Sequence, residues 1–309
     1  MRHIRSLEDL NINASWVTIG SFDGVHLGHQ AIIRQMVAGA HSSGACAVVV
    51  TFYPHPALVL RGIQAPYYLT TPEEKSELLE QLGVDIQITM HFDRHLASLT
   101  AEEFMQKLHD HLGVTQLWVG EDFALGHNRQ GTVPVLKEIG GWMGYIVKTI
   151  DPILIDGQIV SSSLIRSLIS QGKIAQANRL LGRRYSISGE VVHGDGRGHG
   201  LGIPTANLEL KPNMLVPTNG VYATWSWLEG KRYASVTSIG LRPTFEDTPP
   251  VPRAEPHLLD FHQNIYGKLL KLDFIDFIRP EERFSSINLL LAQIEQDILK
   301  TREILAHDQ

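Results

Sequence analysis

Two histidines, His26 and His29, stand three residues apart in a segment that is rich in glycine and short polar residues. Protonated imidazoles can donate to phosphate oxygens, which would stabilise the charge that develops when a nucleotidyl group is transferred. The pair could also be half of a metal site, but a zinc site needs further Cys or His ligands at suitable spacing, and none stands nearby. Gly24 and Gly28 would let a nucleotide approach the backbone closely. The segment therefore predicts a place where a nucleoside triphosphate is held and attacked.

This segment, Gly20 to His29, lies between an expected strand and an expected helix. Trp16 to Ile19 is an apolar run typical of a buried strand, and Gln30 to Val37 carries apolar residues at helical spacing. The free N–H groups of a first helical turn point at a bound phosphate. Ser21 and Asp23 would stand at the strand end. The chain has neither the P-loop pattern nor Gly-x-Gly-x-x-Gly, which excludes those two phosphate sites.

Two more polar segments follow expected strands in the same half of the chain. Thr51-Phe52-Tyr53-Pro54-His55-Pro56 ends an apolar run, and its aromatic and proline residues suit the wall of a flat-ring pocket. Gly120-Glu121-Asp122-Phe123 follows the run Gln116 to Val119. Either segment could instead be an ordinary connection, and the residues alone leave both interpretations open.

The serines Ser161 to Ser163 are expected to cap a helix over Leu164 to Ile169, because serine hydroxyls accept the unpaired N–H groups of a first turn. Arg166 lies one turn inside that helix. It could reach a phosphate held near the helix start, or it could be an ordinary solvated arginine.

The second half of the chain has its own candidates. Glycines occur at every second position from Gly194 to Gly202, immediately before Ile203-Pro204-Thr205-Ala206-Asn207. Thr205 and Asn207 would face the same way on an extended chain, and their side-chain oxygens are ligands that Mg²⁺ accepts alongside substrate phosphates. Glu255 could be a surface acid or a general base that removes a proton from a substrate hydroxyl.

Strands alternate with helices in the first half, which predicts a doubly wound parallel sheet with ligands beyond the carboxyl ends of the strands. Short strands with turn signals follow from Ser186, which predicts a compact antiparallel barrel. The proline-rich piece Thr248 to Pro256 is interpreted as a loop, and apolar residues from Ile287 to Leu305 trace a final helix. Arg183-Arg184 is interpreted as a hinge between two domains, residues 1–183 and 184–309.

Composition limits the possible partners and compartment. The chain has 27 basic and 33 acidic residues among 309, and this net charge of −6 argues against broad nucleic-acid binding. The single Cys46 permits no internal disulfide. No signal peptide is recognisable after Met1, and no apolar run approaches the roughly 18 residues of a membrane span. We expect a cytoplasmic protein that acts on small molecules, and the oligomeric state is left open.

Taken together and in this order, the motifs resemble the bacterial bifunctional riboflavin kinase/FMN adenylyltransferase family, often called FAD synthetase. Gly20 to His29 is similar to its adenylyltransferase signature, a variant of the His-x-x-His motif. Val160 to Arg166 is similar to its Ser-Ser-Thr-x-Ile-Arg motif, with Ser163 in place of threonine, and Gly202 to Asn207 to its kinase signature. Further matching segments are Thr51 to Pro56, Gly120 to Gly131, Gly220 to Tyr222, Ile239 to Phe245, Glu255 to Phe261 and Tyr266 to Lys268.

The resemblance implies an α/β protein: a Rossmann-like nucleotidyltransferase domain, then a small antiparallel β-barrel kinase domain with a C-terminal helix. The barrel would phosphorylate riboflavin to FMN with ATP, with Thr205 and Asn207 as Mg²⁺ ligands and Glu255 as base. The first domain would join FMN to a second ATP to give FAD and pyrophosphate, with His26, His29 and Arg166 stabilising the charge. The remaining residues implied to bind substrates are Gly20, Ser21, Phe22, Asp23, Gly28, His55, Asp122, Ser162, Ser163, Gly198, Gly202, Pro204 and Arg279.

Two alternatives compete with this two-step enzyme. Only one half could be active, or the first domain could transfer a nucleotide to another phosphate ester. A flavin-sensing regulator would keep both pockets without turnover, and it predicts the loss of His26, His29 or Asn207. All three of these residues are present.

Overall fold

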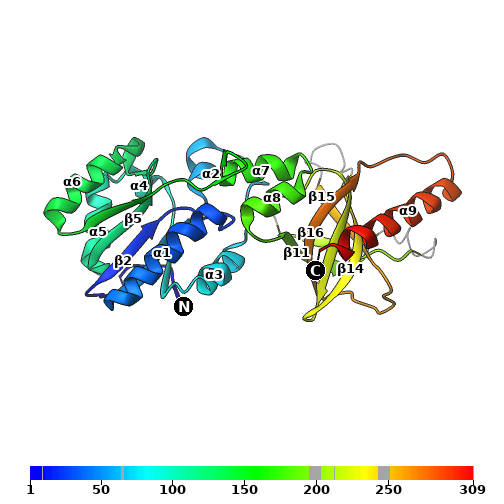
Figure 1. The fold of residues 1–309 in the computed structure, drawn as a ribbon, viewed down its shortest axis with the longest axis horizontal. Coiled ribbons are helices and arrows are strands. Elements are labelled where there is room, and N and C mark those ends of the chain that lie inside the picture. Colours follow the sequence, from blue (N-terminus) through cyan, green and yellow to red (C-terminus); the bar gives the residue numbers. More distant parts are fainter. Residues whose placement is uncertain (9, 64–65, 195–202, 212, 243–250, 309) are drawn as a thin grey trace. The chain divides into compact units, whose positions relative to one another are not determined.

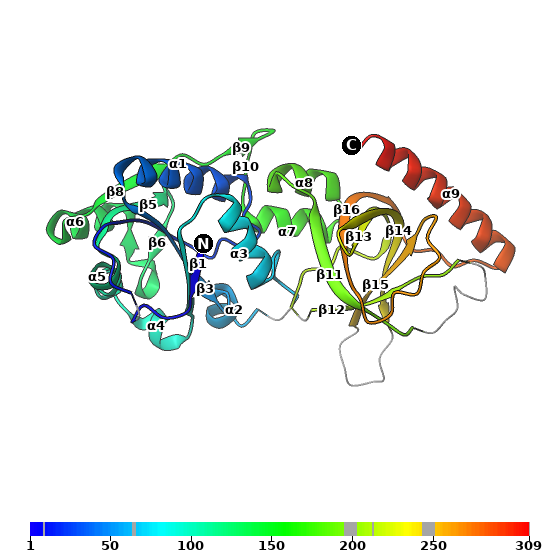
Figure 2. The ribbon, with the colours of Figure 1, turned by 90° about the horizontal axis from the view of Figure 1, so that it is seen from below.

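The computed structural model describes residues 1–8, 10–63, 66–194, 203–211, 213–242 and 251–308. The chain forms two compact units. The first comprises Met1–Gln64 and Thr70–Ser162, and the second comprises Ala65–Leu69 and Ser163–Gln309. Figure 1 and Figure 2 show the elements of each unit in two views.

The first unit is built on a sheet with the strand order β1-β4-β3-β2-β5-β8, in which all neighbouring strands run parallel. These strands are β1 (Arg2–Ile4), β2 (Ser15–Ile19), β3 (Cys46–Tyr53), β4 (Ile86–His91), β5 (Val114–Gly120) and β8 (Ile146–Ile150). From β2 the chain winds outward to β3 and β4 and then returns to β5, on the other side of β2. The winding direction therefore switches between β2 and β5, and such a switch point is where open α/β sheets bind ligands. The predicted doubly wound sheet is confirmed.

Helices cover both faces of this sheet (Figure 1). They are α1 (Leu27–Ser43), α3 (Pro72–Gln81), α5 (Ala101–Leu112) and α6 (Val133–Met143). Successive strand residues point to opposite faces. Val49 accordingly packs in the core with α1 and α3, while Val48 and Val50 pack in the core with α5 and α6. The apolar runs predicted as buried strands are therefore buried on both sides.

Several short elements of the first unit were not predicted from the sequence. They are α2 (Pro56–Arg61), α4 (Arg94–Ser98), the 3₁₀ turn η1 (His127–Arg129), and the paired short strands β6 (Ala124–Leu125) with β7 (Gly131–Thr132) and β9 (Leu154–Ile155) with β10 (Gln158–Ile159). Strands of two residues are too short to carry an alternating pattern, so periodicity does not reveal them.

The second unit is a closed barrel with the strand order β11-β12-β15-β14-β13-β16. Its elements are α7 (Ser162–Ser170, whose first residue belongs to the first unit), α8 (Ile174–Leu181), β11 (Tyr185–Val192), β12 (Asn207–Leu210), β13 (Gly220–Leu228), β14 (Lys231–Arg242), β15 (Val251–Leu258), β16 (Leu269–Arg279) and α9 (Ile287–Ala306). Every strand pair is antiparallel. The predicted barrel and final helix are confirmed.

One prediction in the barrel is wrong. The piece Thr248 to Pro256 was interpreted as a loop, but its described part belongs to β15, which pairs with β14 along its whole length. The carbonyl of Pro256 accepts from Ala206 N at 2.9 Å, so the backbone polar groups of Pro256 face β12 rather than β14. Pro252 has the same strand parity. Both prolines thus lack their N–H on the side of β12, where little pairing is lost, and the strand tolerates them.

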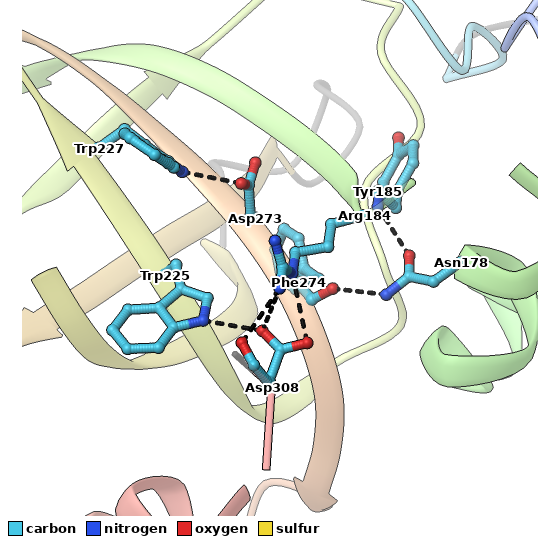
Figure 3. A network of polar contacts seen from close by, with 8 residues as sticks. All are labelled: Asn178, Arg184, Tyr185, Trp225, Trp227, Asp273, Phe274 and Asp308. Carbon is cyan, nitrogen blue, oxygen red and sulfur yellow. Dashed lines mark hydrogen bonds and ion pairs between the residues drawn. The ribbon is translucent and has the colours of Figure 1, made fainter. Parts of the chain in front are cut away.

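Arg184, which the sequence analysis interprets as part of a hinge, is bonded within the second unit. Its guanidinium forms an ion pair of 2.7 Å with Asp308, which also accepts from the indole nitrogen of Trp225 at 2.8 Å (Figure 3). Asn178 of α8 accepts from Tyr185 N and donates to Phe274 O, which fastens the helix to β11 and β16. All of these contacts join residues of the second unit, and the hinge at Arg183-Arg184 stays a prediction. The functional boundary at 183/184 stays a prediction.

Candidate active sites

The turn after β2 has a backbone that few sequences can adopt. Phe22, Gly24 and Val25 have positive φ angles of 45, 81 and 38°. Glycine adopts such angles freely, whereas a β-branched residue such as Val25 does so only at a cost of roughly 1–3 kcal/mol. Surrounding contacts must therefore hold this turn, which spans Ser21–Val25, in place.

Side chains from distant parts of the first unit clamp that turn. The hydroxyl of Ser162 donates to Asp23 O at 2.8 Å, and the buried Asp23 carboxylate accepts from the backbone N–H of Thr70 at 3.3 Å. Ser21 O accepts from the hydroxyl of Thr51 at 3.0 Å and from the ammonium of Lys75 at 2.7 Å. Polar groups from β3, α3 and the start of α7 thus converge on the segment that the sequence analysis opened with.

His26 and His29 lie together at the start of α1, as their spacing predicts. Their ring centroids are 3.6 Å apart and the ring planes differ by 19°. His26 is the N-cap of α1, and its Nδ1 accepts from His29 N at 3.3 Å. A Cβ on Gly28 would lie 3.1 Å from the His26 ring, so any larger residue here would push that ring by a few tenths of an ångström. Two stacked imidazoles at a helix start, where the helix dipole is positive, can donate to one phosphate together.

The other two predicted segments of the first unit also lie at the carboxyl ends of strands. His55 follows β3 and caps α2, and its Nδ1 accepts from Ala57 N at 3.1 Å. Asp122 follows β5 and is exposed, with its backbone carbonyl accepting from Arg129 at 3.2 Å. Because β2, β3 and β5 are neighbours in the sheet, the three predicted segments meet at one edge.

Arg166 and Ser163 belong to the second unit, although α7 begins at Ser162 in the first. The guanidinium of Arg166 lies 3.8 Å from the centre of the Tyr67 ring, and its Nε donates to Tyr67 O at 2.9 Å. This contact fixes the direction of the arginine within the second unit.

Lys75 is a residue of the first site that the sequence analysis missed. Burial lowers its pKa to about 8, and the attraction of Asp23 partly offsets that effect. The signal was present in the sequence: Lys75 precedes the buried Leu79 by one helical turn, at a position of α3 where the pattern calls for an apolar residue.

The predicted kinase segment is attached to β15 in the barrel. The backbone of Ala206 bonds to Pro256 at 2.9 Å, and the Nδ1 of His257 donates to Pro204 O at 2.8 Å. The Oδ1 of Asn207 is buried and has no hydrogen-bond partner among the described residues. A buried amide oxygen that stays unsatisfied costs about 1–3 kcal/mol, so this atom is ready for a ligand.

Glu255 and Arg279 each have an arginine–carboxylate contact. Glu255 Oε1 accepts from Arg253 at 2.8 Å, which places a charged carboxylate on the same strand as Pro256 and His257. Arg279 donates twice from Nε and once from Nη2 to Asp297 of α9, at 2.9, 3.1 and 2.7 Å. Arg279 therefore fastens α9 to β16, and its predicted substrate-binding role stays a prediction. Gly198 and Gly202 lie outside the described residues.

Among the described residues, no group of three or more His, Cys, Asp or Glu side chains could hold a metal ion by itself. The helices within the described ranges also include none that is long and apolar enough to cross a membrane. Cys46 is only partly buried, at the start of β3, where burial raises the pKa of its thiol to about 11.

Comparison with known proteins divides the chain in two. Residues 9–164 match the FAD synthetase family model, and residues 181–305 match the riboflavin kinase model. Curated relatives named bifunctional riboflavin kinase/FMN adenylyltransferase include those of Bacillus subtilis, 38% identical over 92% of this chain and 90% of the relative, and Escherichia coli K12, 36% identical over 98% and 96%. The relative from Listeria monocytogenes is 36% identical over 94% of this chain and 92% of its own.

A solved structure has the same fold over nearly the whole chain. It is a Streptococcus pneumoniae crystal structure named as a macrolide-efflux protein, with a TM-score of 0.89, 30% identity, and coverage of 97% of this chain and 98% of that one. The efflux name describes that protein, and what the likeness contributes here is the fold.

Proposed function

The chain belongs to the bifunctional riboflavin kinase/FMN adenylyltransferase family, and we propose how its residues divide the family's two reactions. It phosphorylates riboflavin to FMN with ATP, and it then adenylylates FMN with ATP to give FAD and pyrophosphate. We assign adenylyl transfer to Gly20–His29 and phosphorylation to the segment around Thr205, Asn207 and Glu255. The observation that carries the first assignment is the stacked histidine pair at the start of α1.

In adenylyl transfer, an FMN phosphate oxygen attacks the α-phosphorus of ATP. A new phosphorus–oxygen bond forms, and the bond to the departing pyrophosphate breaks. His26 and His29 would donate to the oxygens on which charge develops, and the positive end of the α1 dipole would favour the same charge. The backbone around the phosphates would be shaped by five residues: Gly20, Ser21, Phe22, Asp23 and Gly28. Among them, Gly28 leaves room for the His26 ring. Catalysis would rest on positioning and electrostatics.

Five other residues are assigned to adenylyl transfer by the sequence. Ser162 ties the start of α7 to Asp23, and Ser163 and Arg166 follow it in the same helix. Arg166 would bring a positive charge to the transferred phosphate. His55 and Asp122, at the ends of β3 and β5, would line the flavin or nucleotide pocket.

In phosphorylation, Glu255 would accept the proton of the riboflavin 5′-hydroxyl while the hydroxyl oxygen attacks the γ-phosphorus of ATP. The Oε1 of Glu255 accepts from Arg253 at 2.8 Å, which orients this carboxylate on β15. Pro204 would bind substrate beside Thr205, and we extend the same expectation to Gly198, Gly202 and Arg279.

Thr205 and Asn207 fit a magnesium ion. Asn207 has a buried side-chain oxygen without a partner among the described residues, which suits a cation held jointly with substrate phosphates. When bound, Mg²⁺ would neutralise charge on the phosphate oxygens. The protein's part would be to fix the Asn207 amide, which packs against Gly194 so closely that a Cβ there would lie 2.1 Å from Asn207 Nδ2.

We also infer that the protein acts in the cytoplasm on small molecules without a nucleic-acid partner. The supporting features are its substrates, its single cysteine and its net charge of −6. The kinase domain would begin at residue 184, as the sequence predicts.

Two variants test the assignment. His29→Ala should stop the reaction at FMN when the protein is incubated with riboflavin, ATP and Mg²⁺. Asn207→Ala should block FMN formation, and the same protein should still make FAD from supplied FMN. The flavin products can be separated chromatographically and quantified by fluorescence.

Folding controls make the result decisive. Each variant retains the other unit's activity if the assignment is right, so every sample carries its own check. A folded variant that loses both reactions would contradict the assignment of one reaction to each unit. If the unaltered protein makes neither FMN nor FAD, the proposal that it catalyses these two reactions is refuted.

A further inference from the structure

Lys75 is a buried charged residue that the proposed mechanism does not use. It lies on the inner face of α3, with 7% of its surface exposed, one turn before Leu79, which is fully buried. The helix begins at a capping box in which Thr71 and Glu74 each bond to the backbone of the other, so the position of Lys75 is well fixed. Burying an ammonium group is costly unless it is paired, and such a residue calls for a functional reason.

The ammonium of Lys75 meets the carbonyl at the start of the Ser21–Val25 turn. Its Nζ lies 2.7 Å from Ser21 O and 3.4 Å from the Thr51 hydroxyl, which itself donates to Ser21 O at 3.0 Å. One carbonyl oxygen thus accepts from two buried donors, one on β3 and one on α3. The charged groups that act on or respond to Lys75 are Asp23, whose carboxylate attracts it, and His3 of β1, whose pKa it helps to lower.

This contact sets the direction of the next N–H group. In a planar trans peptide the carbonyl and the N–H point in opposite directions. Because Ser21 O points at Lys75, the N–H of Phe22 points away from it. Phe22 is also the first of the residues with positive φ in the turn, at 45°, and its ring packs edge-on against His29 at 5.1 Å. The lysine therefore acts on both the backbone and the ring that support the histidine pair.

We propose that Lys75 is a positioning residue for adenylyl transfer: it holds the Ser21 carbonyl inward so that the Phe22 N–H and the His26–His29 pair face the substrate phosphates. Its charge also favours anions at this edge of the sheet. A hydrocarbon side chain would fill the same space without the cost of a buried charge, so the geometry favours a role in the reaction over a role in folding alone. The inference rests on the assignment of adenylyl transfer to Gly20–His29.

Lys75→Met tests the proposal in the full-length protein. We expect kcat/KM for FAD formation from FMN to fall by roughly 10- to 100-fold, which is less than the roughly 100- to 1,000-fold cost of losing a direct donor, because Lys75 acts through Ser21. Riboflavin kinase activity, measured on the same sample, should stay within about twofold. Lys107→Met, an exposed lysine of α5, is the matched control and should leave both activities unchanged.

The pH profile separates positioning by charge from simple packing. FAD formation by the unaltered protein should decline as pH rises through about 8, where burial places the pKa of Lys75, and Lys75→Met should lack this limb. Substrate phosphates are already ionised there, because their second pKa is about 6. The kinase reaction serves as the reference for any general effect of pH.

Thr51→Val keeps the shape of the side chain and removes the other donor to Ser21 O. It should lower FAD formation less than Lys75→Met does, and it provides a second test if Lys75→Met folds poorly. The proposal is overturned if Lys75→Met keeps full FAD formation, or if the alkaline limb is unchanged in that variant. It is also overturned if Thr51→Val has no effect and the unaltered protein has no alkaline limb. If FAD formation is lost in His29→Ala but not in Lys75→Met, only the role of Lys75 is refuted. If FAD formation is lost in neither variant, the assignment of adenylyl transfer to Gly20–His29 is refuted.

Discussion

The ion pair between Arg279 and Asp297 offers a quantitative test of what Arg279 does. Three N–H···O contacts of 2.7–3.1 Å join the two side chains, which are only 15% and 3% exposed. Gln293 also donates to Asp297 at 3.0 Å. Removing one partner of such a pair strands the other charge in a poorly solvated place, which costs about 3–5 kcal/mol.

Asp297→Ala should therefore lower the urea midpoint of the second unit by about 2 M, if m is near 2 kcal/mol per M. The loss of riboflavin kinase activity with increasing urea follows this unit specifically. The double variant Arg279→Met with Asp297→Leu should stay within about 1 kcal/mol of the unaltered protein, because it replaces the pair by hydrocarbon without leaving a buried charge.

A second ion pair of α9 is the matched control. Arg302 bonds to Asp260 at 2.8 Å, but both side chains are largely exposed, at 48% and 75%. Asp260→Ala should cost less than about 1 kcal/mol, since water screens exposed pairs. Equal costs for Asp297→Ala and Asp260→Ala would refute the reasoning from burial.

The double variant also decides the substrate-binding role predicted for Arg279. If the arginine only fastens α9, kinase KM values for ATP and riboflavin will be unchanged in a double variant of normal stability. A raised KM at normal stability would assign Arg279 to substrate binding.

Two further predictions concern the first unit. Gly28→Ala should raise helix stability by up to about 1 kcal/mol, because alanine favours helix more than glycine does. The same variant should lower FAD formation, because the new Cβ would lie 3.1 Å from the His26 ring. Calorimetry measures the first effect and flavin assays the second, and unchanged FAD formation would contradict this reasoning. The pKa of Lys75 is about 8 when folded against an ordinary 10.5, so the unfolded chain binds more protons between these values. Burial of the Lys75 ammonium therefore lowers the free energy of unfolding by its full amount below pH 8. This penalty shrinks as pH rises, by about 3 kcal/mol in all. Urea titrations should show that the difference in unfolding free energy between Lys75→Met and the unaltered protein is smaller at pH 10 than at pH 7.5. The same difference at both pH values would contradict the lowered pKa of Lys75.

Much of the fold could be predicted from local sequence patterns. The strand at Trp16 to Ile19 and the helix at Ile287 to Leu305 were predicted because burial on both faces and a regular apolar stripe leave strong periodic signals. The strand β15 was missed because its prolines argue against a strand. Only the pairing in the barrel shows that β15 bonds along its whole length to β14 and at one position to β12, so that a missing N–H on the β12 side is tolerated. The role of Arg184 was missed for a similar reason, since its partner Asp308 is 124 residues away.

The sequence by itself determined the family, the two reactions and the order of the motifs, because residue types at short spacing, such as His26 and His29 at a helix start, carry chemistry locally. Only the tertiary structure decided which side chains support those motifs. Lys75 is 54 residues from Ser21 in the chain, and Asp23 is 139 residues from Ser162. Such contacts form only when the sheet and its helices assemble, so no local pattern could pair them. From the sequence alone, the segment Gly20 to His29 is predicted to place two histidines at a phosphate. In the folded protein it is also a strained turn, held by a buried lysine that the sequence pattern placed among apolar residues.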